Sequence, residues 1–171
     1  MKWVFSVLAM LLSFFLSCNI TSKIKKEERE LSELLKSVYM LGRDICDSLI
    51  PLPEAFKGCA RMCHSSKEIS KFYMSLSEQI SDEQKTDFFT IWRVELDGLF
   101  KNYTFIKKDS LLELGHFLGK SGADGQKRAI EKCALLLGAE LDALKENYEK
   151  YHKLINVSPV AITGVIVLLI I

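Results

Sequence analysis

The C-terminal third of the sequence constrains the fold most, because an amphipathic helical pattern there passes directly into an apolar segment. From Gln126 onward, apolar residues recur every three or four positions as far as Ile155, which is the spacing of one helix face. Charged residues stop at Lys153, and residues 154–171 contain none. At about 1.5 Å per residue, such a helix can just cross a hydrocarbon layer of roughly 30 Å. We therefore expect a helical body whose last helix continues into a membrane.

A second uncharged segment, residues 3–20, follows a single basic residue, Lys2. Its length favours an uncleaved membrane helix. The alternative is a signal segment cleaved near Cys18, since Ser17 supplies the small residue expected before a lipid-modified cysteine. The sequence thus predicts transmembrane helices at 1–20, where a signal anchor is the other interpretation, and at 154–171, with a helical domain at 21–153 between them.

Basic residues near the two apolar segments predict which side of the membrane the middle domain occupies. Several follow the first segment and several precede the second, whereas Lys2 alone lies on the far side of either: Lys23, Lys25, Lys26, Arg29, Lys145, Lys150 and Lys153. Because basic residues are retained on the cytoplasmic side, we expect a multi-pass protein of the cell membrane, in contact with lipid, whose middle domain is cytoplasmic.

The middle domain has the pattern of an all-α, six-helix bundle. Its apolar stripes predict helices at 28–50, 54–64, 67–81, 81–100, 111–118 and from 126, with the first pairing antiparallel to the last. The 81–100 segment is rich in aromatic residues and is expected to fill the centre. The chain has 23 basic against 22 acidic residues, and this balance argues against nucleic-acid binding.

No motif in the sequence indicates catalysis. Gly119-Lys120-Ser121 lacks the upstream glycine and the preceding strand of a phosphate-binding loop. The Cys59–Cys63 spacing is one residue too long for a Cys-x-x-Cys pair, and no second pair answers it. Without a nucleophile–base pair or a metal cluster, we expect a protein that is not an enzyme and that holds no metal or cofactor. A membrane-bound enzyme would have only the Cys59–Cys63 pair in its favour.

Two short stretches resemble a known family. Residues 51–56, PLPEAF, resemble the PLPEA turn of stage III sporulation protein AB, and residues 112–121 followed by Gln126 resemble its LGxxLGxSDxxxQ stretch. Trp92 stands where that family commonly has a tryptophan. The sequence departs from the pattern at Gly122, where the family has an aspartate, and at Gly125. The resemblance covers the whole chain, including both apolar ends.

The resemblance implies a fold similar to the helical domain of the type II secretion platform protein. It also implies a place in the mother-cell membrane around the forespore, within the channel formed by the other stage III A proteins. A secretion-type ATPase is the expected partner, and self-association into a homo-oligomer is left open. We expect the partner interface in the turn residues of the two stretches, which are Pro51, Pro53, Glu54, Gly115, Gly119, Ser121 and Gln126. The alternative function is an exported or lipid-anchored helical binding module, with the first segment cleaved near Cys18.

Overall fold

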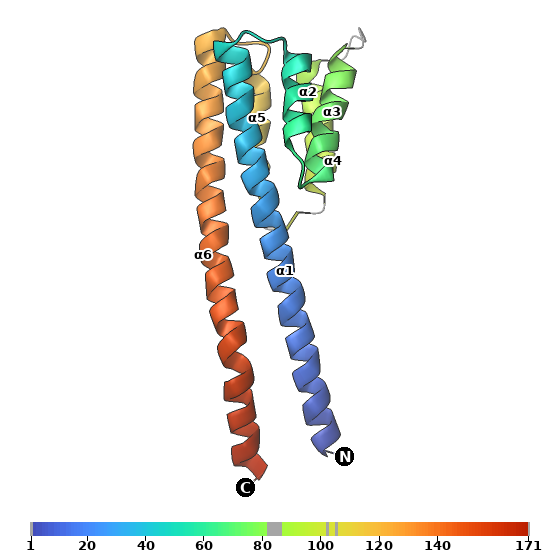
Figure 1. Ribbon diagram of the computed structural model, residues 1–171, viewed down its shortest axis with the longest axis vertical. Helices are drawn as coiled ribbons and strands as arrows, with labels where there is room; N and C mark the ends of the chain where they lie inside the picture. Colours follow the sequence, from blue (N-terminus) through green and yellow to red (C-terminus); the bar gives the residue numbers. More distant parts are fainter. Residues whose placement is uncertain (1, 82–86, 102, 105, 171) are drawn as a thin grey trace. The chain divides into compact units, whose positions relative to one another are not determined.

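The computed structural model is built from helices (Figure 1). In chain order, the helices are α1 (Lys2–Gly42), a π-helix (Arg43–Asp47), α2 (Leu52–Met62), α3 (Lys67–Ser81), α4 (Phe88–Phe100), α5 (Asp109–Phe117) and α6 (Ala123–Ile170). The backbone is described for residues 2–81, 87–101, 103–104 and 106–170, and the side chains for residue 19 and for 21–150 with the same gaps. No strand occurs in these ranges, so the all-α prediction is confirmed.

The chain divides into two compact units. One comprises Met1–Glu28 with Asp142–Ile171, and the other is Arg29–Leu141, called here the helical body. The helical body contains α2 to α5 entirely, together with the adjoining parts of α1 and α6. All the predicted interface residues lie in it. The predicted domain limits after residues 20 and 153 stay a prediction.

The first predicted helix of the middle domain, 28–50, was wrong at both ends. α1 is continuous from Lys2, because residues 21–27 contain no proline or glycine that would interrupt it. The α-helix ends at Gly42 and gives way to the π-helix, after which the Ile50 amide donates to the carbonyl of Asp44 at 2.8 Å. Pro51 disfavours the helical conformation in the residue before it, so the helix cannot run up to the proline.

The other boundaries differ from the predictions by a few residues. α3 matches the predicted 67–81, α2 and α5 each begin two residues earlier than predicted, and α6 begins at Ala123 rather than Gln126. Pro51 occupies the N-cap of α2, with φ −56° and ψ 143°, so the helix can start directly after it. The start expected at Ser81-Asp82-Glu83 falls largely on 82–86, outside the described residues; the described helix begins at Phe88.

An aromatic core joins α2, α3 and α4, as the aromatic pattern of 81–100 predicted. We define it as Phe56, Phe72, Tyr73, Phe88 and Trp92, whose neighbouring ring centroids lie 5.0 to 6.4 Å apart. Trp92 is fully buried, and its Nε1 donates to the Leu111 carbonyl of α5 at 2.8 Å. The Tyr73 hydroxyl and the Ser37 hydroxyl of α1 lie 2.6 Å apart. The polar atoms of these rings are therefore paired, as burial requires.

Candidate docking surface

The turn between α1 and α2 exposes an apolar side chain on strained backbone. Leu49 has φ 52°, in the left-handed region that disfavours side chains, and it is 77 % exposed. Pro51 and Glu54 are also exposed. Pro53 is half-buried, and its carbonyl accepts a hydrogen bond from Ser77 of α3 at 2.8 Å. The structure thus leaves Leu49, Pro51 and Glu54 open to contact, whereas Pro53 also fixes the start of α2.

Two glycines of the second predicted stretch have structural roles. A Cβ on Gly115 would lie 2.8 Å from Cγ of Trp92, so only glycine lets α5 approach the indole this closely. Gly115 is buried and offers no side chain to a partner. Gly119 has φ 75°, the left-handed conformation in which a glycine commonly terminates a helix such as α5.

Ser121 and Gln126 close the turn between α5 and α6. The Gln126 side-chain amide donates to the Ser121 carbonyl at 2.8 Å, and its backbone amide donates to Gly122 at 3.0 Å. Both residues are half-buried. These bonds hold the turn in one conformation, and the predicted contact of either residue with a partner stays a prediction.

The structure brings the two turns together at one end of the helical body. A Cβ on Gly42, at the end of α1, would lie 2.9 Å from Cγ2 of Ile130 in α6. In the π-helix, burial and the Asp47 carboxylate raise the pKa of the Cys46 thiol, and the ammonium group of Lys127 in α6 opposes them. The end of α1 and the start of α6, which flank the two stretches that carry the family resemblance, are therefore neighbours in space.

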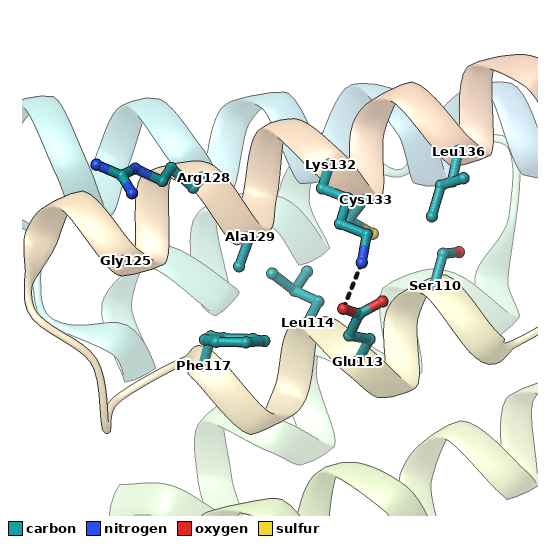
Figure 2. Close-up of a pocket in the computed structure, with 10 residues that line it drawn as sticks. All are labelled: Ser110, Glu113, Leu114, Phe117, Gly125, Arg128, Ala129, Lys132, Cys133 and Leu136. Carbon is teal, nitrogen blue, oxygen red and sulfur yellow. Dashed lines mark hydrogen bonds and ion pairs between the residues drawn. The ribbon is translucent and has the colours of Figure 1, made fainter.

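A groove lies between α5 and the start of α6 (Figure 2). Its volume is about 330 Å³. The lining residues, shown as sticks in Figure 2, are Ser110, Glu113, Leu114, Phe117, Gly125, Arg128, Ala129, Lys132, Cys133 and Leu136. Phe117 and Leu136 are 39 % and 37 % exposed, so the α5–α6 groove has an apolar wall on each helix.

The floor of the α5–α6 groove is buried. Leu114, Cys133 and Ser110 are each more than nine-tenths buried. Burial raises the pKa of the Cys133 thiol to about 12, and the nearby Ser110 hydroxyl opposes that rise only partly. A thiol is a weak hydrogen-bonding group, and Ser110 Oγ has no stronger partner within the described residues. The groove therefore contains an unsatisfied hydroxyl beneath apolar walls.

Charged groups lie along the rim of the groove. Lys132 of α6 pairs with Glu113 of α5 at 2.6 Å, and this contact bridges the two helices in Figure 2. Arg128 is exposed and has no acidic partner in the part of the chain that the structure describes. Because the Lys132 charge is offset by Glu113, Arg128 leaves the rim with one unbalanced positive charge.

The Cys59 and Cys63 thiols are poorly suited to nucleophilic catalysis or metal binding. Cys59 and Cys63 are free, buried side chains, and burial raises the pKa of each thiol to about 12. A thiol with so high a pKa is protonated at neutral pH and is a weak nucleophile and metal ligand. No group of three His, Cys, Asp or Glu side chains within the described ranges is arranged to hold a metal ion.

None of the helices, over the residues with described side chains, combines the length and apolarity needed to span a membrane. The predicted spans, 1–20 and 154–171, lie outside that part of the chain except for residue 19.

Sequence reasoning missed the walls of the α5–α6 groove. Phe117 and Leu136 were not among the predicted interface residues, and Arg128 was not singled out. A usable signal was present in α6, where Leu135 and Leu136 lie off the buried stripe of Cys133, Leu137 and Leu141. Apolar residues beside a complete stripe indicate a second apolar face.

Comparison with known proteins identifies the family. The family model described as stage III sporulation protein AB matches residues 2–171, which is almost the entire chain. No curated protein and no solved structure matched the chain. The chain therefore belongs to the stage III sporulation protein AB family, and its role lies in stage III of sporulation.

Proposed function

We propose that this protein is a non-catalytic platform component of the stage III A channel between mother cell and forespore, and that its helical body docks a secretion-type ATPase. The family match over residues 2–171 supports a role in this stage. The uncharged segments at 3–20 and 154–171, with basic residues on their inner flanks, support anchoring in the mother-cell membrane with the helical body in the cytoplasm.

The observation that carries the docking role is Leu49. A leucine in the left-handed region costs roughly 1–3 kcal/mol, and here its side chain gains little from burial because it is 77 % exposed. The end of the helix before Pro51 requires the left-handed backbone at Leu49, but burial of the leucine side chain does not offset its cost. A partner that covers Leu49 together with Pro51 and Glu54 would bury the side chain and offset the strain.

Binding to the ATPase tests this proposal. The full chain in phospholipid nanodiscs would be titrated with the purified ATPase, and the substitution Leu49→Asp is expected to weaken binding at least about tenfold, which is a loss of about 1.4 kcal/mol. Val94→Asp is the matched control, because Val94 is another exposed apolar residue of the helical body, 59 % exposed and on α4. Equal affinity of Leu49→Asp and the natural chain would refute docking through this turn.

Sidedness tests the membrane arrangement separately. Leu135 is 70 % exposed, so Leu135→Cys provides an accessible thiol, whereas the described cysteines are half-buried (Cys46) or buried (Cys59, Cys63 and Cys133). A membrane-impermeant maleimide should label it only after the cells are permeabilised. Labelling in intact cells would favour the exported or lipid-anchored binding module instead, and N-terminal sequencing would then show a chain that begins near Cys18.

A further inference from the structure

We infer that the α5–α6 groove binds one amphipathic helix of a partner protein, which places an apolar ridge between Phe117 and Leu136 and an acidic side chain against Arg128. This site is separate from the turn residues Leu49, Pro51 and Glu54 of the proposed docking surface. Recognition of this kind, in which the apolar face of a helix enters a groove, relies on anchors spaced at i, i+4 and i+7.

The dimensions of the groove suit about two turns of helix. Arg128 and Leu136 are eight residues apart on α6, which is about 12 Å along the helix axis. Phe117 faces this stretch from α5, so an occupant would meet one exposed apolar side chain on each helix (Figure 2). A groove of about 330 Å³ accommodates a few side chains rather than a whole domain.

The floor of the groove also indicates an occupant. Ser110 Oγ is buried and lacks a strong partner within the described residues, an arrangement that is unfavourable in a closed protein interior. Figure 2 shows the Ser110 side chain directed from α5 toward α6, below Leu136. A polar group of a bound helix would supply the missing hydrogen bond.

The charges on the rim determine which charge a bound helix should carry. Glu113 and Lys132 are already paired across the groove, whereas Arg128 has no acidic partner in the described part of the chain. An acidic residue of a bound helix, one or two turns from its apolar anchors, would reach Arg128. A basic residue at the same place would be repelled.

A second copy of the chain does not offer a suitable ridge. The large apolar side chains exposed on the described residues are Tyr39, Leu49, Met74, Val94, Phe117, Leu135 and Leu136. No two of these lie three or four positions apart on one helix, which is the spacing that a ridge requires. The described surface therefore points to a different protein as the source of the helix.

Two labelled helical peptides would test the inference, with the full chain in phospholipid nanodiscs. Both carry leucines at i, i+4 and i+7, and they differ only in having glutamate or lysine at the position that would face Arg128. The glutamate peptide should bind at least about tenfold more tightly than the lysine peptide, and Arg128→Glu should reverse this preference. Arg93→Glu is the matched control, because it makes the same charge change on an exposed position of α4.

A second pair of variants tests the apolar wall. Leu136→Asp should abolish the binding of both peptides, whereas Val94→Asp should leave it unchanged. Protection of the buried Cys133 thiol from maleimide would verify that the Leu136→Asp chain remains folded. Equal binding of the two peptides, or an unchanged preference in Arg128→Glu, would overturn the inference. So would a change in the oligomeric state of Leu136→Asp without peptide, because the groove would then be filled by a second copy. None of these results depends on whether the ATPase binds at Leu49.

Discussion

The aromatic core and the α5–α6 groove are two helix contacts within the same helical body that differ in how completely they are filled. In the aromatic core, Trp92 is fully buried against Phe56 and Phe72, and its Nε1 has a hydrogen-bond acceptor. In the groove, Phe117 and Leu136 remain more than one-third exposed, and Ser110 Oγ lacks a strong partner within the described residues.

This difference separates residues that stabilise the fold from residues available for binding. In the aromatic core, apolar side chains are buried and polar atoms are hydrogen-bonded within the chain, so substitutions there should act on stability. In the groove, apolar side chains are only partly buried, and a buried hydroxyl lacks a strong hydrogen-bond partner within the described residues. We therefore expect substitutions of its exposed wall residues, Phe117 and Leu136, to change stability little and to act on recognition.

The largest effect is expected for Trp92→Ala. Removing a fully buried indole leaves a cavity among the aromatic rings and deletes the hydrogen bond to Leu111, and the expected loss is about 3–5 kcal/mol in the free energy of unfolding. Urea titration of the full chain, with maleimide labelling of Cys59 read by mass spectrometry, measures this loss directly in the helical body.

Val94→Ala on the exposed face of the same helix is the control for this measurement. It should change the free energy of unfolding by less than about 0.5 kcal/mol. A similarly small effect of Trp92→Ala would show that the aromatic core is not tightly packed, and the distinction between core and groove would fail.

Gly115→Ala should have the next largest effect. The added Cβ would lie within 2.8 Å of Trp92 Cγ, and relief of that overlap requires the indole or α5 to move. Overpacking of this kind costs about 1–3 kcal/mol. The same labelling of Cys59 in urea would detect it, and an unchanged midpoint would show that α5 is free to shift away from α4.

The fold class and the aromatic core could be predicted from the sequence because both depend on local periodicity. Leu96, Leu99 and Trp92 share one helical face, and a helix at 67–81 follows from its own apolar spacing. The π-helix and the left-handed Leu49 could not be predicted in this way. They arise where α1 must end before Pro51 while remaining packed on α6, which is a tertiary constraint.

The candidate site was predictable only as a region. The two family-like stretches lie next to the end of α1 and the start of α6, which approach each other at Gly42 and Ile130, and their contact with a partner stays a prediction. Sequence could not separate Gly115, which is needed for packing on Trp92, from an exposed residue such as Glu54. It also could not reveal a groove between α5 and α6, because a groove depends on how two helices diverge.

Glu33 provides a pH-dependent test of the hydrogen bonds that α1 makes with the start of α3, away from the groove. Its carboxylate accepts backbone hydrogen bonds from Ser65 and Ser66, both at 2.9 Å, and so caps the start of α3. Partial burial raises the pKa of Glu33, but these bonds and the charge of His64 outweigh it and hold the pKa below its ordinary value of 4.5. A lowered folded-state pKa means that the carboxylate stabilises the fold above that value and loses this effect as pH falls through the folded pKa.

Glu33→Gln should therefore cost about 1 kcal/mol at neutral pH, the usual value of a helix cap. The difference from the natural chain should shrink as the pH is lowered below 4.5. Urea midpoints measured across this range, again by labelling Cys59, check both statements. A difference that stayed constant with pH would mean that the charge of Glu33 is not what stabilises α3.

The smallest effect is expected for Gly138→Ala, which adds the same methyl group as Gly115→Ala at a position where it meets no neighbouring atom. Gly138 lies within α6, and a Cβ built there meets no atom within 4 Å among the described residues. Alanine should therefore stabilise the helix by about 0.5–1 kcal/mol, because glycine loses more backbone entropy on folding. Labelling of the buried Cys133 in urea would report the gain close to the substitution. Since the two glycine substitutions add the same methyl group, opposite signs would isolate the packing difference between Gly115, which lies against Trp92, and Gly138, whereas a loss of stability at both positions would show that α6 is covered at Gly138.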